Sequence, residues 1–264
     1  MLFRSPPVAA REVEAFSNIG HDLNIAVADL IDNSIEAGAR NVEVTFPDPN
    51  EHGRILAISD DGSGMRPREL ARAMRIGSSR DYSESDLGKY GLGLKAASLS
   101  QARVVAVASR TATTKTEVLA WDKRRITETG EWKLLQPEFD ERRMGLLTDP
   151  LLDRPGTVVL WDDMTPPRNQ RRKQGRNRGE AISAHGLELR LLARHLGKVL
   201  HRFIEGRARG KPKLNLTING NEVEALDPLV GWHPETEPLE TQSVRIPRGV
   251  DEPDEIVEIH PVIV

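Results

Sequence analysis

The stretch ADLIDNSIEAGA, Ala28–Ala39, decides the fold of this 264-residue chain. Around it, apolar side chains recur every three or four positions, which is the spacing of one face of an α-helix. These side chains are Ile25, Ala28, Ile31 and Ile35. The pattern predicts a helix over residues 23–37, and Gly38 suits its C-terminal end.

Polar residues lie on another side of this predicted helix. Asp29, Asn33 and Glu36 are spaced i, i+4 and i+7, and Asp32 sits beside them, so together they form one polar edge. A solvated helix face explains such an edge as well as a ligand site does. This helix alone does not separate the two interpretations.

A carboxylate and glycines follow the next apolar run. Ile55–Ser59 is typical of a short strand, and it leads directly into Asp60-x-Gly62-x-Gly64. A carboxylate at a strand end can accept a hydrogen bond while glycines let the backbone approach a flat ligand. A plain glycine-rich turn gives the same pattern.

A second glycine motif, GKYGLGLK at Gly88–Lys95, opens a predicted helix over residues 94–100. Amides at a helix N-terminus, with glycines, favour anion binding, and Lys95 adds a full positive charge. The preceding residues 78–87 are polar and rich in turn formers, which indicates a loop. Gly156-Thr157 leads a later strand and means nothing alone.

Further helices and strands complete an alternating pattern. Pro67 opens a short helix that Gly77 closes, residues 187–205 form a long amphipathic helix, and Asn219-Gly220 marks a hairpin over 214–223. The other strands are predicted at 42–46, 103–109, 116–121 and 156–161. The mixture predicts an α/β two-layer sandwich with a mixed, mostly antiparallel sheet and helices on one face.

Composition excludes several classes of chemistry. The chain has no cysteine, which removes disulfides, thiolate nucleophiles and cysteine-based metal sites. A net charge of −3 argues against the whole chain being an electrostatic nucleic-acid binder, although RNQRRKQGRNR at 168–178 is strongly basic. That stretch fits a solvated loop or a nucleic-acid contact. No apolar run is long enough to span a membrane and no signal peptide is recognisable, so we expect a cytoplasmic protein.

The order and spacing of the motifs give them joint meaning. ADLIDNSIEAGA, ISDDGSGM, GKYGLGLKAAS and then Gly-Thr before a strand resemble the GHKL ATPase superfamily with its Bergerat nucleotide fold. They look closest to the microrchidia (MORC)-like ATPases and their bacterial relatives. LNLTINGNEVEALDPL also looks like the hairpin that follows the nucleotide site in that group. The resemblance covers about residues 15–230.

The resemblance implies a role for each matching residue. Asn33 would hold the Mg²⁺ that bridges the ATP phosphates, and Asp60 would bind the adenine amine, with Thr157 reaching the base through water. Residues 77–90 would be the ATP lid, which includes Arg80 as a weaker candidate. The complete nucleotide-binding set is Asn33, Asp60, Gly62, Gly64, Met65, Ser79, Gly88, Tyr90, Gly91, Leu92, Gly93, Leu94, Lys95 and Thr157.

Asp29 stands where many members of the superfamily have the catalytic Glu that polarises the attacking water. Asp is a competent base but one methylene shorter, and a misplacement of about 1 Å can cost roughly 10²-fold in rate. We therefore expect Asp29 to position the lytic water with slow hydrolysis. The alternatives are an ATP-binding module without turnover, and a histidine-kinase-type phosphotransferase that would use His21.

The resemblance also implies a domain plan and partners. Residues 1–20 would form an N-terminal strap for an ATP-dependent homodimer, although a frayed terminus fits equally. The expected parts then are an ATP-binding domain at 21–165, a basic loop at 166–180, a helix–hairpin extension at 181–230 and the start of a transducer-like domain at 231–264. The apolar run ending at Val264 suggests an N-terminal piece of a longer protein that acts on DNA or protein.

Overall fold

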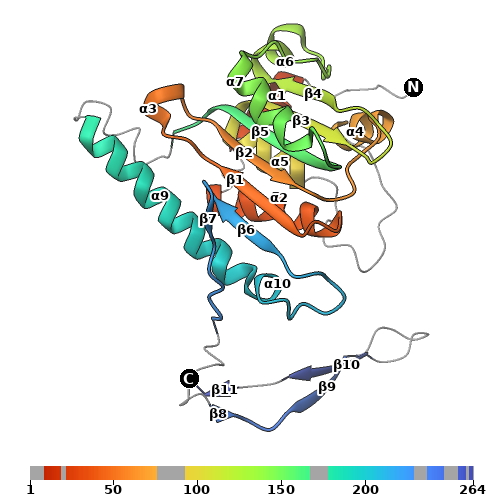
Figure 1. Ribbon diagram of the computed structural model, residues 1–264, viewed down its shortest axis with the longest axis vertical. Helices are drawn as coiled ribbons and strands as arrows, with labels where there is room; N and C mark the ends of the chain where they lie inside the picture. Colours follow the sequence, from red (N-terminus) through yellow and green to blue (C-terminus); the bar gives the residue numbers. More distant parts are fainter. Residues whose placement is uncertain are drawn as a thin grey trace, which may run out of the picture.

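The computed structural model describes residues 9–18, 22–75, 93–166, 178–228, 237–246, 255–259 and 262–263 (Figure 1). Its centre is a seven-stranded sheet with the strand order β4-β3-β5-β2-β1-β6-β7. Neighbouring strands of this sheet are antiparallel except β1 and β6, which are parallel. The predicted mixed, mostly antiparallel sheet is therefore confirmed. Its strands are β1 (Asn41–Thr45), β2 (Leu56–Asp60), β3 (Ala102–Arg110), β4 (Glu117–Asp122), β5 (Gly156–Met164), β6 (Asn215–Ile218) and β7 (Asn221–Glu222).

One face of the sheet carries the larger helical layer, as predicted. Alternate strand residues such as Leu56, Val105 and Trp161 point into it and join a single buried cluster with the helices. The helices of this layer are α1 (Ala9–Asn18), α2 (Leu23–Glu36), α4 (Pro67–Met74), α5 (Gly93–Gln101), α6 (Lys123–Thr129) and α9 (Arg178–Val199). Ile25, expected in the core, is 46% exposed, whereas Ile31 and Ile35 are buried as expected, together with Ala26, Val27 and Leu30.

The opposite face of the sheet has a smaller cover that the sequence pattern did not predict. Leu147 of α7 (Glu141–Thr148) and Leu151 of the 3₁₀ turn η1 (Asp149–Leu151) pack there against Ala106 and Leu160. β3 is consequently buried on both faces over residues 104–108, which explains why these five residues are all apolar.

The long helix predicted over residues 187–205 is interrupted in the structure. α9 ends at Val199, and a separate short helix, α10 (His201–Ile204), follows it. A continuous helix would pair the Gly197 carbonyl with the His201 amide, but this carbonyl accepts a hydrogen bond from the Leu226 amide at 2.8 Å. α9 also begins at Arg178, inside the stretch that we expected to be a basic loop.

The predicted hairpin is confirmed as β6 and β7. Its two turn residues, Asn219 (φ 48°) and Gly220 (φ 75°), both have positive φ, as a two-residue type I′ turn requires. The side-chain amide of Asn219 also pairs with the backbone of Phe46: its Oδ1 accepts a hydrogen bond from Phe46 N at 2.7 Å, and its Nδ2 donates one to Phe46 O at 2.9 Å. The hairpin is thus tied to the end of β1.

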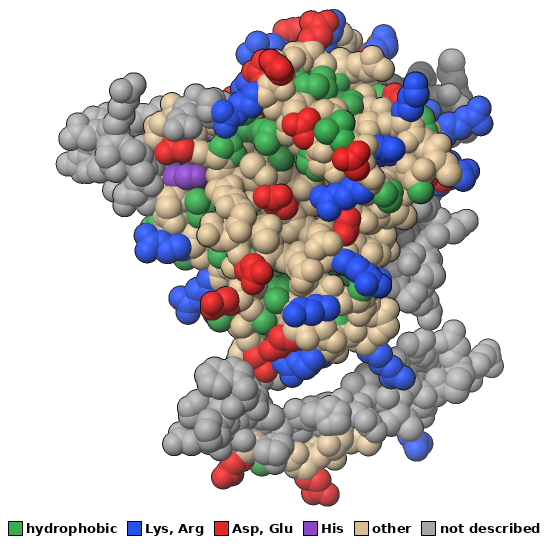
Figure 2. Space-filling model, viewed as in Figure 1, with side chains coloured by type: hydrophobic (Ala, Val, Ile, Leu, Met, Phe, Trp, Pro, Cys, Tyr) green, Lys and Arg blue, Asp and Glu red, His purple; other side chains and the backbone are tan. Residues whose placement is uncertain are grey.

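The remaining described elements are short. β9 (Gln242–Ile246) pairs with β10 (Glu255–Ile259), and β8 (Glu237–Pro238) pairs with β11 (Val262–Ile263). The four-residue helix α3 (Pro49–His52) lies between β1 and β2. None of the described helices combines the length and apolarity needed to cross a membrane. Figure 2 shows acidic and basic side chains interspersed over one face of the molecule.

Candidate functional site

Three neighbouring strands bring polar residues together at one end of the central sheet. Asp60 ends β2 directly opposite Thr157 on β5, and Thr157 lies opposite Ser109 on β3. All three share the side of their strands that faces the α2 and α5 layer, because residues two and four positions away belong to that core. The register of the sheet therefore builds this cluster from residues far apart in sequence.

Asp60, the carboxylate of this cluster, is buried, with 5% of its surface exposed. Its Oδ1 accepts hydrogen bonds from the Gly62 amide at 2.9 Å and the Thr157 amide at 3.2 Å, and its Oδ2 accepts one from Ser34 Oγ at 3.0 Å. Burial raises the pKa of Asp60, against these hydrogen bonds, which lower it.

The glycines beside Asp60 are required by the protein's own packing. Gly64 has φ +65°, and a Cβ there would lie 1.9 Å from the carbonyl oxygen of Arg110. A Cβ at Gly62 would lie 2.8 Å from the Cβ of Ala37 on the α2 side. The DxGxG motif thus folds the turn after β2 tightly against β3 and α2, in addition to any approach of a ligand.

Ser109 connects the turn after β2 to the start of β5. Its hydroxyl accepts a hydrogen bond from the Met65 amide at 2.9 Å, donates to Gly156 O at 3.0 Å and lies 3.0 Å from Thr157 Oγ1. Ser109 is fully buried, whereas Thr157 is half-buried. Met65 and Thr157, both predicted site residues, are therefore joined through a serine that the motifs did not include.

The polar edge of α2 borders the same cluster through Ser34. Asn33 is exposed and Asp29 is half-buried, and Asn33 Nδ2 donates to the Asp29 carbonyl at 3.0 Å, one helical turn earlier. The amide oxygen of Asn33 carries no hydrogen bond among the described residues. Burial, and the negative charges of Asp29 and Glu36, raise the pKa of Asp32 to about 6.

α5 packs against α2 and begins at Gly93, as the second glycine motif predicts. Lys95 on its first turn is buried, with 2% of its surface exposed, and burial lowers its pKa. Leu94 is half-buried and packs on the core. The predicted site residues Ser79, Gly88, Tyr90, Gly91 and Leu92, with Arg80 and the rest of the expected lid, lie outside the described residues.

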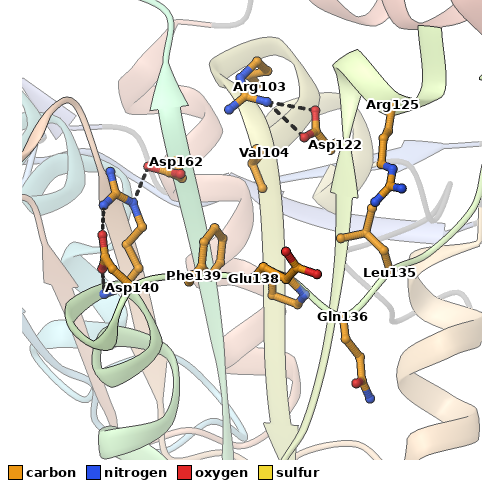
Figure 3. A pocket seen from close by; sticks show the side chains of 12 residues that line it. Arg103, Val104, Asp122, Arg125, Leu135, Gln136, Glu138, Phe139, Asp140 and Asp162 are labelled. Atoms are coloured by element: carbon orange, nitrogen blue, oxygen red, sulfur yellow. Dashed lines mark hydrogen bonds and ion pairs between the residues drawn. The ribbon is translucent and has the colours of Figure 1, made fainter. Parts of the chain in front are cut away.

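A separate cavity of about 380 Å³ lies at the other end of the sheet, where β3 begins and β4 and β5 end (Figure 3). Two arginines in its wall are paired with acids: Arg103 donates to both oxygens of Asp122 at 3.0 Å, and Arg143 Nε donates to Asp162 at 3.0 Å. Leu135 and Phe139 supply apolar parts of the lining. None of the predicted site residues lines this cavity.

Comparison with known proteins identifies the class. The family profile described as histidine kinase-, DNA gyrase B-, and HSP90-like ATPase matches residues 21–152, which is half of the chain. This match covers Asp60 and Ser109 of the cluster, the α2 edge and α5, and it ends before Thr157. The chain belongs to this family of ATPases, which confirms the resemblance seen in its motifs.

The similar proteins within that class include microrchidia-type proteins and MutL. The chain is 31% identical to Protein MICRORCHIDIA 6 of Arabidopsis thaliana over 44% of the chain and 18% of the relative, and 40% identical to ATPase morc-1 of Caenorhabditis elegans over 26% and 8%. It is 26% identical to the DNA mismatch repair protein MutL of Aeromonas hydrophila over 75% of the chain and 31% of the relative. The chain thus spans about a third or less of the length of each of these relatives.

Ser34 and Ser109 are the site residues that sequence reasoning missed. Ser109 follows Val105 and Val107 in strict alternation, so its position indicated a polar side chain on the buried face of β3. Ser34 lies within the ADLIDNSIEAGA stretch but on the buried stripe of α2. In both cases a polar residue occupies a position where the helix or strand periodicity predicts a buried side chain, and buried polar groups need hydrogen-bond partners.

Proposed function

We propose that this chain is the nucleotide-binding module of a Mg²⁺-dependent ATPase, with the adenine amine bound by Asp60. One observation carries the proposal: a buried carboxylate with a raised pKa stands at the sheet end beside Thr157, without a cationic partner among the described residues. Such an acceptor suits an N–H donor of a ligand in a site shielded from water. The family membership supports ATP as that ligand.

Asn33 is the residue proposed to hold Mg²⁺. Its side-chain amide nitrogen donates a hydrogen bond to the Asp29 carbonyl within α2, which leaves the amide oxygen as the group that could bind a metal. Oxygen ligands suit this hard cation. No group of three or more His, Asp or Glu side chains that could hold a metal occurs among the described residues. Most ligands of Mg²⁺ would thus come from phosphates and water, and the ion would neutralise phosphate charge when bound.

The phosphates are proposed to lie at the start of α5. The residues offered there are Gly88, Tyr90, Gly91, Leu92, Gly93, Leu94 and Lys95, with Ser79 from the lid. The positive end of α5 and the Lys95 ammonium supply favourable electrostatics for a polyphosphate. Burial of Lys95 on the same helix supports a short-range role for its charge.

Asp29 is proposed as the base that positions the lytic water, and it separates the leading proposal from an ATP-binding module without turnover. Asp29→Asn keeps the size of the side chain and removes its basicity, so we expect steady-state phosphate release to fall at least about 10²-fold with ATP affinity little changed. Asp29→Glu is the matched control and should turn over at least as fast as wild type. Wild-type turnover in Asp29→Asn would contradict the assignment.

Absence of phosphate release in the wild type, with intact ATP binding, would favour the binding module. Transfer of labelled phosphate onto the protein would instead favour the kinase-type alternative. Asn33→Ala should abolish the Mg²⁺-dependent part of ATP binding, and wild-type protein without any nucleotide affinity would remove the central proposal.

ATP-gated dimerisation and action on DNA or protein complete the proposal. α1 lies against α5 and α6 of its own chain, where Lys123 Nζ donates to Ser17 Oγ at 3.0 Å and Trp132 Nε1 donates to Glu12 at 2.7 Å. This attachment next to α5 supports communication between residues 1–20 and the phosphate site. A non-hydrolysable ATP analogue should convert monomer to dimer in sedimentation experiments.

The basic stretch 168–178 is the proposed nucleic-acid contact, and the name of the MutL relative makes DNA the first substrate to test. Residues 167–177 lie outside the described residues, so the proposal rests on charge alone. Replacing three of its arginines by glutamine should weaken DNA binding and reduce its salt dependence. Unchanged binding would exclude this stretch.

A further inference from the structure

We propose that Ser109 is a positioning residue that makes the site select a 6-amino purine over a 6-oxo purine, by holding the Thr157 hydroxyl as a hydrogen-bond acceptor. This inference rests on the proposed function, because it assumes that the base lies against Asp60 and Thr157. Ser109 itself is fully buried and cannot touch a ligand, so it acts through Thr157.

The direction of the hydrogen bonds follows from counting protons. A serine hydroxyl has one proton to donate and two lone pairs that accept. The Met65 amide can only donate, so it occupies one lone pair of Ser109. The Gly156 carbonyl can only accept, so it takes the single Ser109 proton. With the Ser109 proton given to Gly156, we assign the Thr157 hydroxyl, 3.0 Å away, as the donor to the second lone pair.

Thr157 is left with lone pairs and no free proton. Ser109 is the sole hydrogen-bond partner of the Thr157 hydroxyl among the described residues, and Thr157 is only half-buried. The neighbouring Asp60 carboxylate, when ionised, is also an acceptor only. The two groups at the sheet end therefore both require N–H or water donors.

This arrangement distinguishes purines at position 6. An exocyclic amine brings two N–H donors, which match acceptors on Asp60 and on Thr157, directly or through water. A 6-oxo group brings an acceptor to the same place. Its N1–H donor lies one ring position away and can pair with only one of the two acceptors, so the other acceptor faces the 6-oxo oxygen, which is unfavourable in a shielded site. ATP and inosine triphosphate (ITP) differ only at this edge of the ring, so they are a matched pair of ligands.

The test compares dissociation constants for ATP and ITP by calorimetry at pH 8 on the full chain. Wild type should bind ATP more tightly than ITP by about 100-fold or more. In Ser109→Ala the Thr157 proton is released and can turn toward a 6-oxo group, so the ITP-to-ATP ratio of dissociation constants should fall about 5- to 10-fold. Ser98→Ala removes another fully buried serine hydroxyl, one that has no hydrogen-bond partner in the described part of the chain, and should leave the ratio unchanged.

A double-mutant cycle separates positioning from a general structural effect. In a Thr157→Val background no hydroxyl remains to be oriented, so adding Ser109→Ala should not change the ratio further. A merely structural role of Ser109 would weaken both nucleotides equally and move the ratio in neither background. If Ser109→Ala does not fold, Ser109→Cys keeps the volume with a poor hydrogen-bonding group and should lower the ratio in the same direction.

The possible failures are distinct. If wild type binds neither nucleotide, the proposed function falls together with this inference. If wild type binds ATP and ITP equally, or Ser109→Ala keeps the wild-type ratio, the role of Ser109 is wrong while ATP binding stands.

Discussion

The carboxylates at the two ends of the central sheet have different partners. At one end Asp60 is held by a serine hydroxyl and two backbone amides, with no cation among its partners in the described part of the chain. At the other end, in the cavity of Figure 3, Asp162 pairs with Arg143 and Asp122 pairs with Arg103. Both ends are built from the same strands, β3 and β5, within one sheet.

This difference supports the proposal that the nucleotide binds at the Asp60 end of the sheet. A carboxylate paired with a guanidinium is neutralised within the protein and contributes to the fold. Asp60 has no such cation among the described residues, and burial raises its pKa; groups with shifted pKa values cluster at functional sites. Under the proposed function, Asp60 is the carboxylate available to a ligand, whereas the arginine-paired acids contribute to the fold.

Asp60→Asn should have the largest effect on ATP affinity, because it changes the carboxylate that has no cationic partner among the described residues. The amide oxygen of asparagine can still accept the Gly62 and Thr157 amides, but its nitrogen cannot accept a donor from the ligand. We expect ATP affinity to fall by on the order of 100-fold, about 3 kcal/mol. Calorimetric titration with ATP measures this loss.

The same variant should keep or gain stability without nucleotide. Because burial raises the pKa of Asp60, the wild-type stability from this group is present below pH 3.8 and is lost as pH rises through the raised value. The stability of Asp60→Asn relative to wild type should thus improve from pH 4 to pH 8 in urea unfolding. A strongly destabilised variant at pH 8 would show that Asp60 is a structural residue.

Arg143→Met tests the opposite end of the sheet. It leaves Asp162, a residue only 8% exposed, without its guanidinium partner, and should lower the free energy of unfolding by about 2 kcal/mol. ATP affinity should stay within about twofold, since the site lies at the other end of β5. Lys133→Met breaks the exposed Lys133–Glu131 pair and should cost no more than about 0.5 kcal/mol.

Loss of ATP affinity in Arg143→Met, measured on folded protein, would contradict the division of the sheet into a ligand end and a structural end. Urea unfolding and calorimetry on the same preparation give both numbers. The Lys133→Met variant controls for the removal of one positive charge.

The parts of the molecule that the sequence predicted are those encoded by local pattern. The 23–37 helix, the strand before Asp60 and the Asn219-Gly220 hairpin each follow from spacing or turn chemistry within a few residues, and each is present. The position of Asp60 and Thr157 side by side followed only from the family's motif order. Their roles toward ATP remain predictions.

The missed features depend on contacts between distant segments. The interruption of the long helix at Leu200 arises because Leu226 takes the Gly197 carbonyl, which no local pattern encodes. The Arg143–Asp162 pair and the Ser109 network likewise need the registers of β3 and β5. Ile31 and Ile35 lie in the core as predicted, but Ile25 was misassigned, because the buried stripe at the start of α2 runs through Ala26 and Val27.

Controls aside, the smallest expected effect on stability is at Asp61, the immediate neighbour of Asp60. Comparing these two residues contrasts two carboxylate environments that are adjacent in sequence. Asp61 accepts the Arg40 amide at 2.7 Å and the Asn41 amide at 2.9 Å, together with the Asn41 side chain. Burial acts to raise its pKa, but these hydrogen bonds and the charge of Arg154 outweigh it, so the pKa is lowered.

The pH dependence of Asp61→Asn should therefore be opposite to that of Asp60→Asn. With a lowered pKa, the stability from Asp61 is present above pH 3.8 and is lost as pH falls through the lowered value. Asp61→Asn should cost about 1 kcal/mol from pH 5 to pH 8, after solvent screening, and this cost should shrink below pH 4. Urea unfolding across this range tests it, with ATP affinity expected to change less than about threefold. If both variants showed the same pH trend, the environments of the two neighbouring carboxylates would not differ as their hydrogen bonds indicate. The raised pKa of Asp60 would then no longer support its proposed role in binding a ligand.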